Sequence, residues 1–134
     1  MNNKQIGLIT EQKVIVKLLE LGYIVSKVIG DNAPYDVVIE RDSILLRAQI
    51  KSGRYRNGCV LFNTVAYRLN TKGSYISNYI GRADIFIIYC QELEIYLSVL
   101  VLACPSKSGM AFRVDKPKNN QRANVHYYQN FLLK

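Results

Sequence analysis

The chain lacks tryptophan and has only one histidine, His126, and three cysteines, Cys59, Cys90 and Cys104. A structural zinc site needs about four closely spaced nitrogen or sulfur ligands, and no Cys-x-x-Cys pair is present, so we expect no zinc. An odd number of cysteines favours reduced, buried thiols over a disulfide framework. Any serine or cysteine nucleophile paired with histidine would depend on His126, in a basic and aromatic tail, and the sequence does not favour that chemistry.

Long hydrophobic runs are also missing. The longest, Ile85 to Cys90 and Val99 to Cys104, are much shorter than the roughly 20 residues of a transmembrane helix. The first five residues lead into no apolar signal segment. We therefore expect a cytoplasmic protein with no membrane partner. The hydrophobic content of 49% and the length predict one folded domain over residues 1–134.

Acidic residues are scarce. The chain has 10 aspartate and glutamate residues against 18 lysine and arginine residues, which gives a net charge of +8. The segment from Arg41 to Arg82 holds eight basic residues and one acidic residue, Asp42. Such clustering predicts a polyanionic partner, because basic groups gain affinity by releasing counterions from phosphates. Charge alone does not distinguish DNA, RNA and an anionic membrane.

The first element is predicted to be a helix over residues 4–21, which Asn2 or Asn3 caps and Gly22 ends. Four residues form its expected apolar face: Leu8, Ile15, Leu18 and Leu19. Glu11 and Gln12 fall on the same side, where packing alone would favour hydrophobic residues. The helix therefore directs polar groups toward the interior.

Most of the remaining chain is predicted to be strand. The expected strands cover residues 23–28, 35–40, 43–52, 59–65, 84–90 and 94–103, with a short apolar segment at 110–114. Residues 53–58 are expected to form a basic loop, and residues 66–82 show no clear period. This order predicts an α+β fold with a mixed central sheet flanked by helices, and with an added DNA-binding hairpin or loop.

Polar side chains converge at one end of a predicted hairpin. Alternation puts Ile44, Leu46, Ala48 and Ile50 on an apolar face of the strand over residues 43–52, and Leu45, Arg47, Gln49 and Lys51 on the other face. A two-residue turn at Asp42-Ser43 would set Asp36 opposite Gln49 and Pro34 opposite Lys51. Directly opposed residues have Cβ atoms about 4.5–5.5 Å apart, so Asp36, Gln49 and Lys51 should meet.

This combination suits metal-assisted hydrolysis of a phosphodiester. Mg²⁺ prefers oxygen ligands, and it lowers the pKa of a bound water. A nearby ammonium group such as that of Lys51 can orient the water and stabilise the transition state. Glu11, on the helix face that should pack against the sheet, can supply a further carboxylate.

The same residues resemble the motif of the PD-(D/E)xK nuclease superfamily: Ala33-Pro34-Tyr35-Asp36, then Gln49-Ile50-Lys51, after a helix that contains Glu11. The compact length, Leu21-Gly22-Tyr23 and Lys51-Ser52-Gly53 are similar to the small bacterial (cyanobacterial-type) homing endonucleases encoded in group I introns. The resemblance implies a restriction-endonuclease-like core and cleavage of a long duplex DNA target. It also implies a homo-oligomer, dimer or tetramer, because one active site cuts one strand.

The resemblance assigns roles to these positions. Glu11, Asp36, Gln49 and Lys51 would be catalytic, and Glu11, Asp36, Gln49 and the carbonyl of Ile50 would hold Mg²⁺, with Mn²⁺ as a substitute. The sequence departs from the family at Gln49, which stands where the family has a second acid. An amide oxygen can bind a hard cation but brings no negative charge, so either the site tolerates glutamine or the enzyme is inactive.

Other interpretations stay open. Singly, Asp36 suits a turn hydrogen bond, Lys51 a surface position and Glu11 a solvent-facing edge; together they favour a nuclease. A structure-selective nuclease, such as the archaeal Holliday junction resolvases, and a non-catalytic nucleic-acid-binding module are the alternatives to a homing enzyme.

Two segments are predicted to bind DNA. Arg54, Tyr55, Arg56 and Asn57 follow the lysine directly, where basic and amide groups can contact phosphates and base edges. The second segment carries Lys72 and Arg82 together with Tyr67, Asn70, Tyr75, Asn78 and Tyr79. Its tyrosines can instead be core or interface residues. The tail residues Lys107, Lys116, Lys118 and Arg122 either extend this surface or only add charge.

Overall fold

The computed structural model describes residues 1–104, 109–117 and 125–134. It begins with the helix α1 (Asn3–Glu20), as predicted to within one residue. Asn2 accepts a hydrogen bond from the backbone N–H of Gln5 while the Gln5 side chain accepts one from that of Asn2, which is a capping box. At the other end Gly22 has φ +92°, and N–H groups of Gly22 and Tyr23 bond back to the last turn in a Schellman arrangement.

The strands form one seven-stranded mixed sheet and one separate hairpin. They are β1 (Ile24–Lys27), β2 (Val37–Arg41), β3 (Ile44–Arg56), β4 (Cys59–Phe62), β5 (Val65–Asn70), β6 (Gly73–Asn78), β7 (Ile85–Cys90), β8 (Ile95–Leu100) and β9 (Met110–Arg113). The order β1-β2-β3-β4-β9 is antiparallel throughout, and β7 adds to β3 in parallel and then pairs with β8. The mixed α+β architecture predicted from the sequence is therefore confirmed.

The hairpin of β2 and β3 has the predicted register. Asp42 and Ser43 both have positive φ, 55° and 64°, as a tight two-residue turn requires. The ladder runs from Arg41–Ile44 to Val37–Ala48, as the two-residue turn predicts, and it ends before Asp36 and Gln49. The Asp36 backbone N–H donates to the Ala48 carbonyl at 2.9 Å, one residue out of register with this ladder, as at a β-bulge, so the direct pairing of Asp36 with Gln49 predicted from the sequence is not formed.

The expected basic loop over residues 53–58 is wrong, because β3 continues to Arg56. The turn consists of Asn57-Gly58, with φ 51° and 74°, and leads into β4. Gly53 is required in this strand by the space around it and not by a turn, because a Cβ there would lie 2.7 Å from Val60 Cγ1 and 2.8 Å from Ile88 Cγ2. A single bent strand thus carries both the metal-site candidates and the basic residues.

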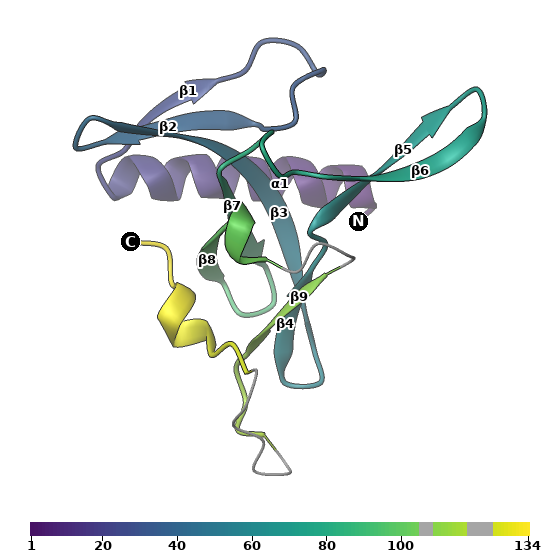
Figure 1. Cartoon of the computed structure of the whole chain (residues 1–134). Coiled ribbons are helices and arrows are strands. Elements are labelled where there is room, and N and C mark those ends of the chain that lie inside the picture. Colours follow the sequence, from purple (N-terminus) through teal and green to yellow (C-terminus); the bar gives the residue numbers. More distant parts are fainter. Residues whose placement is uncertain (105–108, 118–124) are drawn as a thin grey trace.

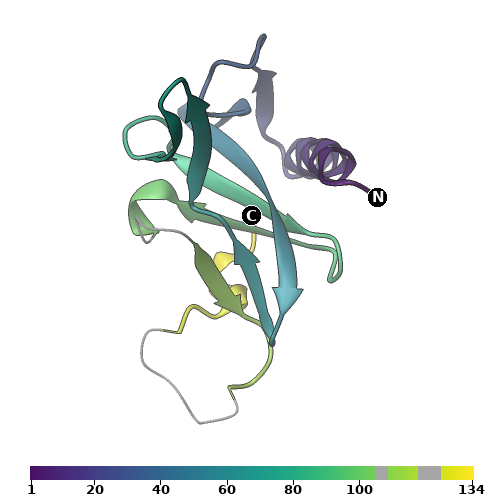
Figure 2. The ribbon, with the colours of Figure 1, turned by 90° about the vertical axis from the view of Figure 1, so that its right-hand side faces the viewer.

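The buried side of α1 differs from the predicted one. Its buried residues are Thr10, Val14 and Leu18, whereas Leu8 and Leu19 are 60% and 56% exposed and Gln12, expected on the inward side, is exposed as well. The helical pattern of the sequence mispredicted the buried side because α1 contacts the twisted sheet only along a narrow stripe. Val14 and Leu18 pack on one face of the sheet, with Val37, Ile39, Ala48 and Ile50. Figure 2, in which α1 is seen nearly end-on, shows the helix on this side of the sheet.

A second core lies on the other face. It contains twelve buried residues: Val60, Phe62, Tyr79, Ala83, Phe86, Ile88, Cys90, Leu97, Val99, Val101, Met110 and Phe112. Within the described ranges α1 is the only α-helix, so the several flanking helices expected from sequence reduce to one. Short 3₁₀ helices, η1 (Val101–Ala103) and η2 (Tyr128–Phe131), complete the elements, and η1 replaces the end of the strand expected over 94–103.

Residues 66–82, which showed no period, contain most of a regular hairpin. Its strands β5 and β6 pair from Val65–Asn78 to Asn70–Gly73. Figure 1 shows this hairpin extending away from the body of the molecule, where packing against a core imposes less of the alternation that predicts a strand. No helix in the described part of the chain is long and apolar enough to cross a membrane.

Candidate active site

Asp36 lies just before β2 and its carboxylate reaches the neighbouring strand. Its Oδ2 accepts a hydrogen bond of 2.8 Å from the backbone N–H of Ile50. The N–H and C=O of one strand residue point to the same side, so the Ile50 carbonyl also faces this edge of β3. Asp36 and the Ile50 carbonyl are therefore directed toward a common point.

Burial and the neighbouring charges together determine the direction in which the pKa of Asp36 is shifted. Burial raises the pKa of this carboxyl above its ordinary value of 3.8, and the negative charge of Glu11 raises it further. The hydrogen bond from Ile50 and the positive charge of Lys51 act in the opposite direction and are outweighed. The carboxyl of Asp36 is thus close enough to both Glu11 and Lys51 to be affected by their charges, as expected for residues of one site.

Lys51 is held by a residue from outside the hairpin. Its Nζ donates a hydrogen bond of 3.1 Å to the hydroxyl of Tyr79 and lies 4.8 Å from the centroid of that ring. Tyr79, which directly follows β6, is buried. Of the two interpretations for the tyrosines after the lysine strand, Tyr79 therefore takes the core position, and it also orients Lys51.

Glu11 reaches the same end of the sheet from α1. Its Oε1 lies 3.6 Å from Nζ of Lys27, the last residue of β1. Lys27 pairs with Val37, the neighbour of Asp36 in the chain. Sequence reasoning did not select Lys27, since it lies on a short edge strand with no motif around it.

The donor set suits a hard divalent cation. Among the described residues, no hydrogen bond reaches Oδ1 of Asp36 or the side-chain amide of Gln49, although both residues are only half-exposed. Together with Glu11 and the Ile50 carbonyl, these oxygens match the ligands that Mg²⁺ prefers. Over the same residues, no three histidine, cysteine, aspartate or glutamate side chains gather at one point.

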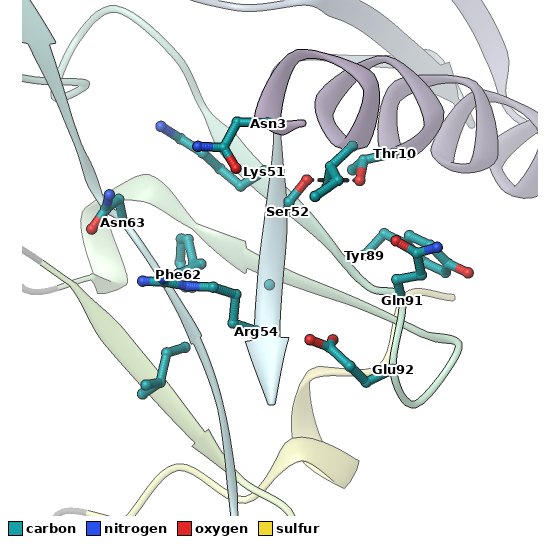
Figure 3. Close-up of a pocket in the computed structure, with 13 residues that line it drawn as sticks. Asn3, Thr10, Lys51, Ser52, Arg54, Phe62, Asn63, Tyr89, Gln91 and Glu92 are labelled. Atoms are coloured by element: carbon teal, nitrogen blue, oxygen red, sulfur yellow. Dashed lines mark hydrogen bonds between the residues drawn. The ribbon is translucent and has the colours of Figure 1, made fainter. Parts of the chain in front are cut away.

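A groove of about 480 Å³ begins at Lys51 and runs between α1 and the strands (Figure 3). Its lining includes Ser52, Arg54 and Asn63, with Gln91 and Glu92 opposite. The Thr10 and Ser52 hydroxyls are 2.7 Å apart in a hydrogen bond that fastens α1 to β3 along the groove. This groove could not be predicted from the sequence, because its residues come from four separate segments.

The four residues predicted to follow Lys51 in a DNA-binding loop do not share a face. Arg54 and Arg56 are exposed on one side of β3, and Figure 3 shows Arg54 extending across the groove. Tyr55 points the other way, and its hydroxyl lies 2.7 and 2.8 Å from the carboxylate oxygens of Asp115. The carbonyl of Asn57 accepts a hydrogen bond from Arg113. Only the two arginines are thus presented to solvent as a pair.

The second candidate segment lies on the projecting hairpin and its base. Lys72 is exposed in the turn between β5 and β6, and Tyr67 and Ile76 form an exposed cross-strand pair, 63% and 58% accessible. Arg82 is half-buried and its NH1 donates to Ser77 Oγ at 2.8 Å, which ties the base of the hairpin. In the tail, Lys116 is exposed, while Lys107, Lys118 and Arg122 lie outside the described residues.

Two further features have structural explanations. Arg47, a charged residue in the middle of β3, forms an ion pair of 3.0 Å with Asp84 and also donates to it through its backbone N–H. The hydrogen bond from Arg47 lowers the pKa of Asp84. Cys59 and Cys90 are buried and Cys104 is half-buried, all as free thiols, and burial raises the pKa of Cys90 and Cys104 to about 11.

A scan against protein families gives the class of the protein that this site indicates. The family model described as PD-(D/E)XK endonuclease matches residues 1–134. The chain therefore belongs to the PD-(D/E)XK endonuclease family, and it is a nuclease by family.

Among solved structures, the chain is similar to one described as a bacterial homing endonuclease, I-Ssp6803I. The two share 25% sequence identity with a TM-score of 0.79, over 98% of this chain and 89% of that one. A comparison with curated proteins found no match. The restriction-endonuclease-like fold expected from the sequence is thus confirmed.

Proposed function

We propose that this protein is a metal-dependent, site-specific DNA endonuclease of the intron-encoded homing type. The observation that carries the proposal is the meeting of Asp36, Glu11 and Lys51 at one end of the β2–β3 hairpin, in a chain of the PD-(D/E)XK family. The likeness to a bacterial homing endonuclease supports the site-specific form of the activity. Residues 1–134 act as one nuclease domain in this proposal.

Mg²⁺, with Mn²⁺ as a substitute, is the proposed cofactor. Glu11, Asp36, Gln49 and the Ile50 carbonyl would hold it, and when bound it would activate a water and neutralise charge on the phosphate. Asp36 fixes the position of the backbone at Ile50 through its hydrogen bond, and Lys51, held by Tyr79, presents an ammonium to the scissile phosphate. Glutamine at position 49 reduces the charge of the ligand set, which predicts a weaker metal site.

Duplex DNA is the proposed substrate, bound along β3 and the projecting hairpin. Arg54 and Arg56 are exposed in the same strand as Lys51, three and five residues further along, so they suit phosphates near the cleaved bond. Lys72 and Arg82 contribute from the hairpin and its base, while Tyr55 acts from the end of β3 and Asn57 from the turn that follows it. Cutting both strands needs two active sites, so we infer a homo-oligomer, a dimer or a tetramer.

Cleavage of defined substrates tests this function. The protein is incubated with a plasmid library, a four-way junction and a structured RNA, each with and without Mg²⁺. The proposal predicts metal-dependent cutting at one long duplex sequence, lost in Lys51→Ala and Asp36→Asn and kept in Lys13→Ala, which removes an exposed charge from α1. Cleavage by both site variants at the parent rate would make the site assignment wrong.

The two alternative functions give different results in the same assay. A junction resolvase would cut the four-way junction regardless of sequence. A non-catalytic module, which the neutral Gln49 favours, would bind without cutting and without any effect of metal. Sedimentation of the protein with and without its duplex measures the number of subunits.

A further inference from the structure

The metal-site candidate contains a second lysine that no motif of the chain assigns. Nζ of Lys27 lies 3.6 Å from Oε1 of Glu11, and this is one of two ion pairs within the described residues. The other ion pair joins Arg47 of β3 to Asp84 and does not involve Glu11. Lys27 is held next to the site by its strand, since Lys27 pairs with Val37 and the N–H of Val28 donates to the Asp36 carbonyl at 3.3 Å.

Two carboxylates of the site, those of Glu11 and Asp36, are close enough to repel each other, and Lys27 compensates this negative charge. Glu11 raises the pKa of Asp36, so the two carboxylates repel each other when both are ionised. Lys51 is engaged by the hydroxyl and ring of Tyr79, on the opposite face of the sheet from the stripe of α1 that packs on Val37. Lys27 is the cation that contacts Glu11 directly.

We propose that Lys27 is a counter-ion that stabilises Glu11 in the metal-free protein and is displaced when a divalent cation binds. Lys27 thereby sets the metal affinity of the site. This rests on the proposed metal-dependent function. It names a positioning residue for that function and a competition between an internal cation and the metal.

The geometry suits displacement. The separation of 3.6 Å is longer than a hydrogen bond, so the pair is held by charge alone. The Lys27 side chain is 61% exposed against 27% for Glu11, so the ammonium can move into solvent while the carboxylate stays. Exposed ion pairs are weak, and a divalent cation brings twice the charge and direct coordination.

The test measures metal binding without DNA and without turnover. Free Mn²⁺ is followed by electron paramagnetic resonance during titration of the wild type, Lys27→Gln and Lys27→Arg. Lys13→Gln is the matched control, since it removes the same charge from an exposed position of α1. Lys27→Gln should tighten Mn²⁺ binding about twofold to fivefold, as loss of an exposed competing pair predicts. Lys27→Arg and Lys13→Gln should bind like the wild type.

The outcomes separate this proposal from the proposed function. If the wild type binds Mn²⁺ and Lys27→Gln does not bind it more tightly, Lys27 is no competitor and the proposal is overturned while the function stands. An equal gain in Lys13→Gln would mean a general effect of net charge and would also overturn it. Absence of Mn²⁺ binding in every variant, or equal binding by Asp36→Asn, would overturn the metal site and the proposed function together.

Discussion

The ammonium of Lys51 and the hydroxyl of Tyr79 are joined by a hydrogen bond of 3.1 Å. Lys51 belongs to the long strand β3, whereas Tyr79 is the first residue after the projecting hairpin of β5 and β6. The candidate catalytic lysine is therefore positioned by the segment that anchors the proposed DNA-binding arm. The following expected outcomes test this arrangement and the site around it.

Tyr79→Phe keeps the ring in the core and removes the acceptor for Lys51. A hydrogen bond to a charged group contributes about 1.5–3 kcal/mol, although part is recovered from water at this half-exposed lysine. We expect kcat to fall about tenfold with little change in KM, as measured in single-turnover cleavage. Tyr67→Phe, on the exposed hairpin, is the control. An unchanged kcat would mean that Tyr79 does not orient Lys51.

Asp36→Asn should abolish cleavage and stabilise the metal-free protein. Burial and the charge of Glu11 raise the pKa of Asp36 above 3.8, so the folded state binds the proton more tightly than the unfolded state. The ionised carboxylate therefore destabilises the fold at neutral pH, and this cost disappears as the pH falls below the ordinary value. The melting temperature of Asp36→Asn should exceed that of the wild type at pH 7 and match it near pH 3. A lower melting temperature at pH 7 would contradict this.

Asp84→Asn should have the opposite dependence on pH. Its pKa is lowered by the hydrogen bond from Arg47, so the ionised form stabilises the fold above the ordinary carboxyl value, and this stability is lost as the pH falls through the lowered pKa. The variant should melt below the wild type at pH 7, and the gap should close in acid. A gap that stays constant down to pH 2 would show that charge is not the cause.

Gln49→Glu restores the acid that the family has at this position. A third carboxylate adds one unit of negative charge to the ligand set, so we expect divalent metal affinity to rise on the order of tenfold. The metal-free protein should lose stability, because Glu11 and Asp36 already repel each other. Calorimetric titration with Mn²⁺ measures the affinity, and Gln12→Glu on the exposed side of α1 serves as control. Unchanged affinity would remove Gln49 from the ligand set.

Gly53→Ala should destabilise the protein by about 1–3 kcal/mol, as overpacking of a close-packed core does. A Cβ at position 53 would overlap Val60 and Ile88, which approach β3 from β4 and β7. Gly7→Ala is the matched control, since nothing lies within 4 Å of a Cβ there and alanine is the better helix residue by about 1 kcal/mol. Urea unfolding should show opposite shifts in midpoint. Equal stability of Gly53→Ala and the wild type would mean that the strands separate at little cost.

The β2–β3 hairpin could be predicted because its information is local. The turn residues Asp42 and Ser43 and the alternation of buried residues together define the register that pairs Arg41 with Ile44 and Val37 with Ala48. The Asn57-Gly58 turn has an equally local sequence signal. The prediction placed a loop there because Arg54 and Arg56 suggested loop residues and not a continuation of the strand. A row of charged residues can equally be the exposed face of a strand.

The remaining parts depend on contacts between distant segments. Lys27 and Tyr79 join the site only because β1 pairs with β2 and because the chain returns from the hairpin under Lys51. The exposure of Leu8 and Leu19 likewise depends on how far the sheet extends beneath α1, which the helical pattern does not contain. Packing geometry, and not local propensity, decides these positions.

Because β3 is continuous, the position of the proposed cleavage site is linked to the position of the arginines proposed to contact DNA. Strand residues advance about 3.3 Å each, so Lys51 and Arg56 lie about 17 Å apart along β3, which is close to the length of five base pairs. Inserting a single residue between them would turn Arg54 and Arg56 to the opposite side of the strand. In the proposed complex β3 therefore sets a constant distance between the cleavage site and the arginines that contact DNA. A change of target during evolution would have to exchange side chains along the strand without changing the number of residues in it.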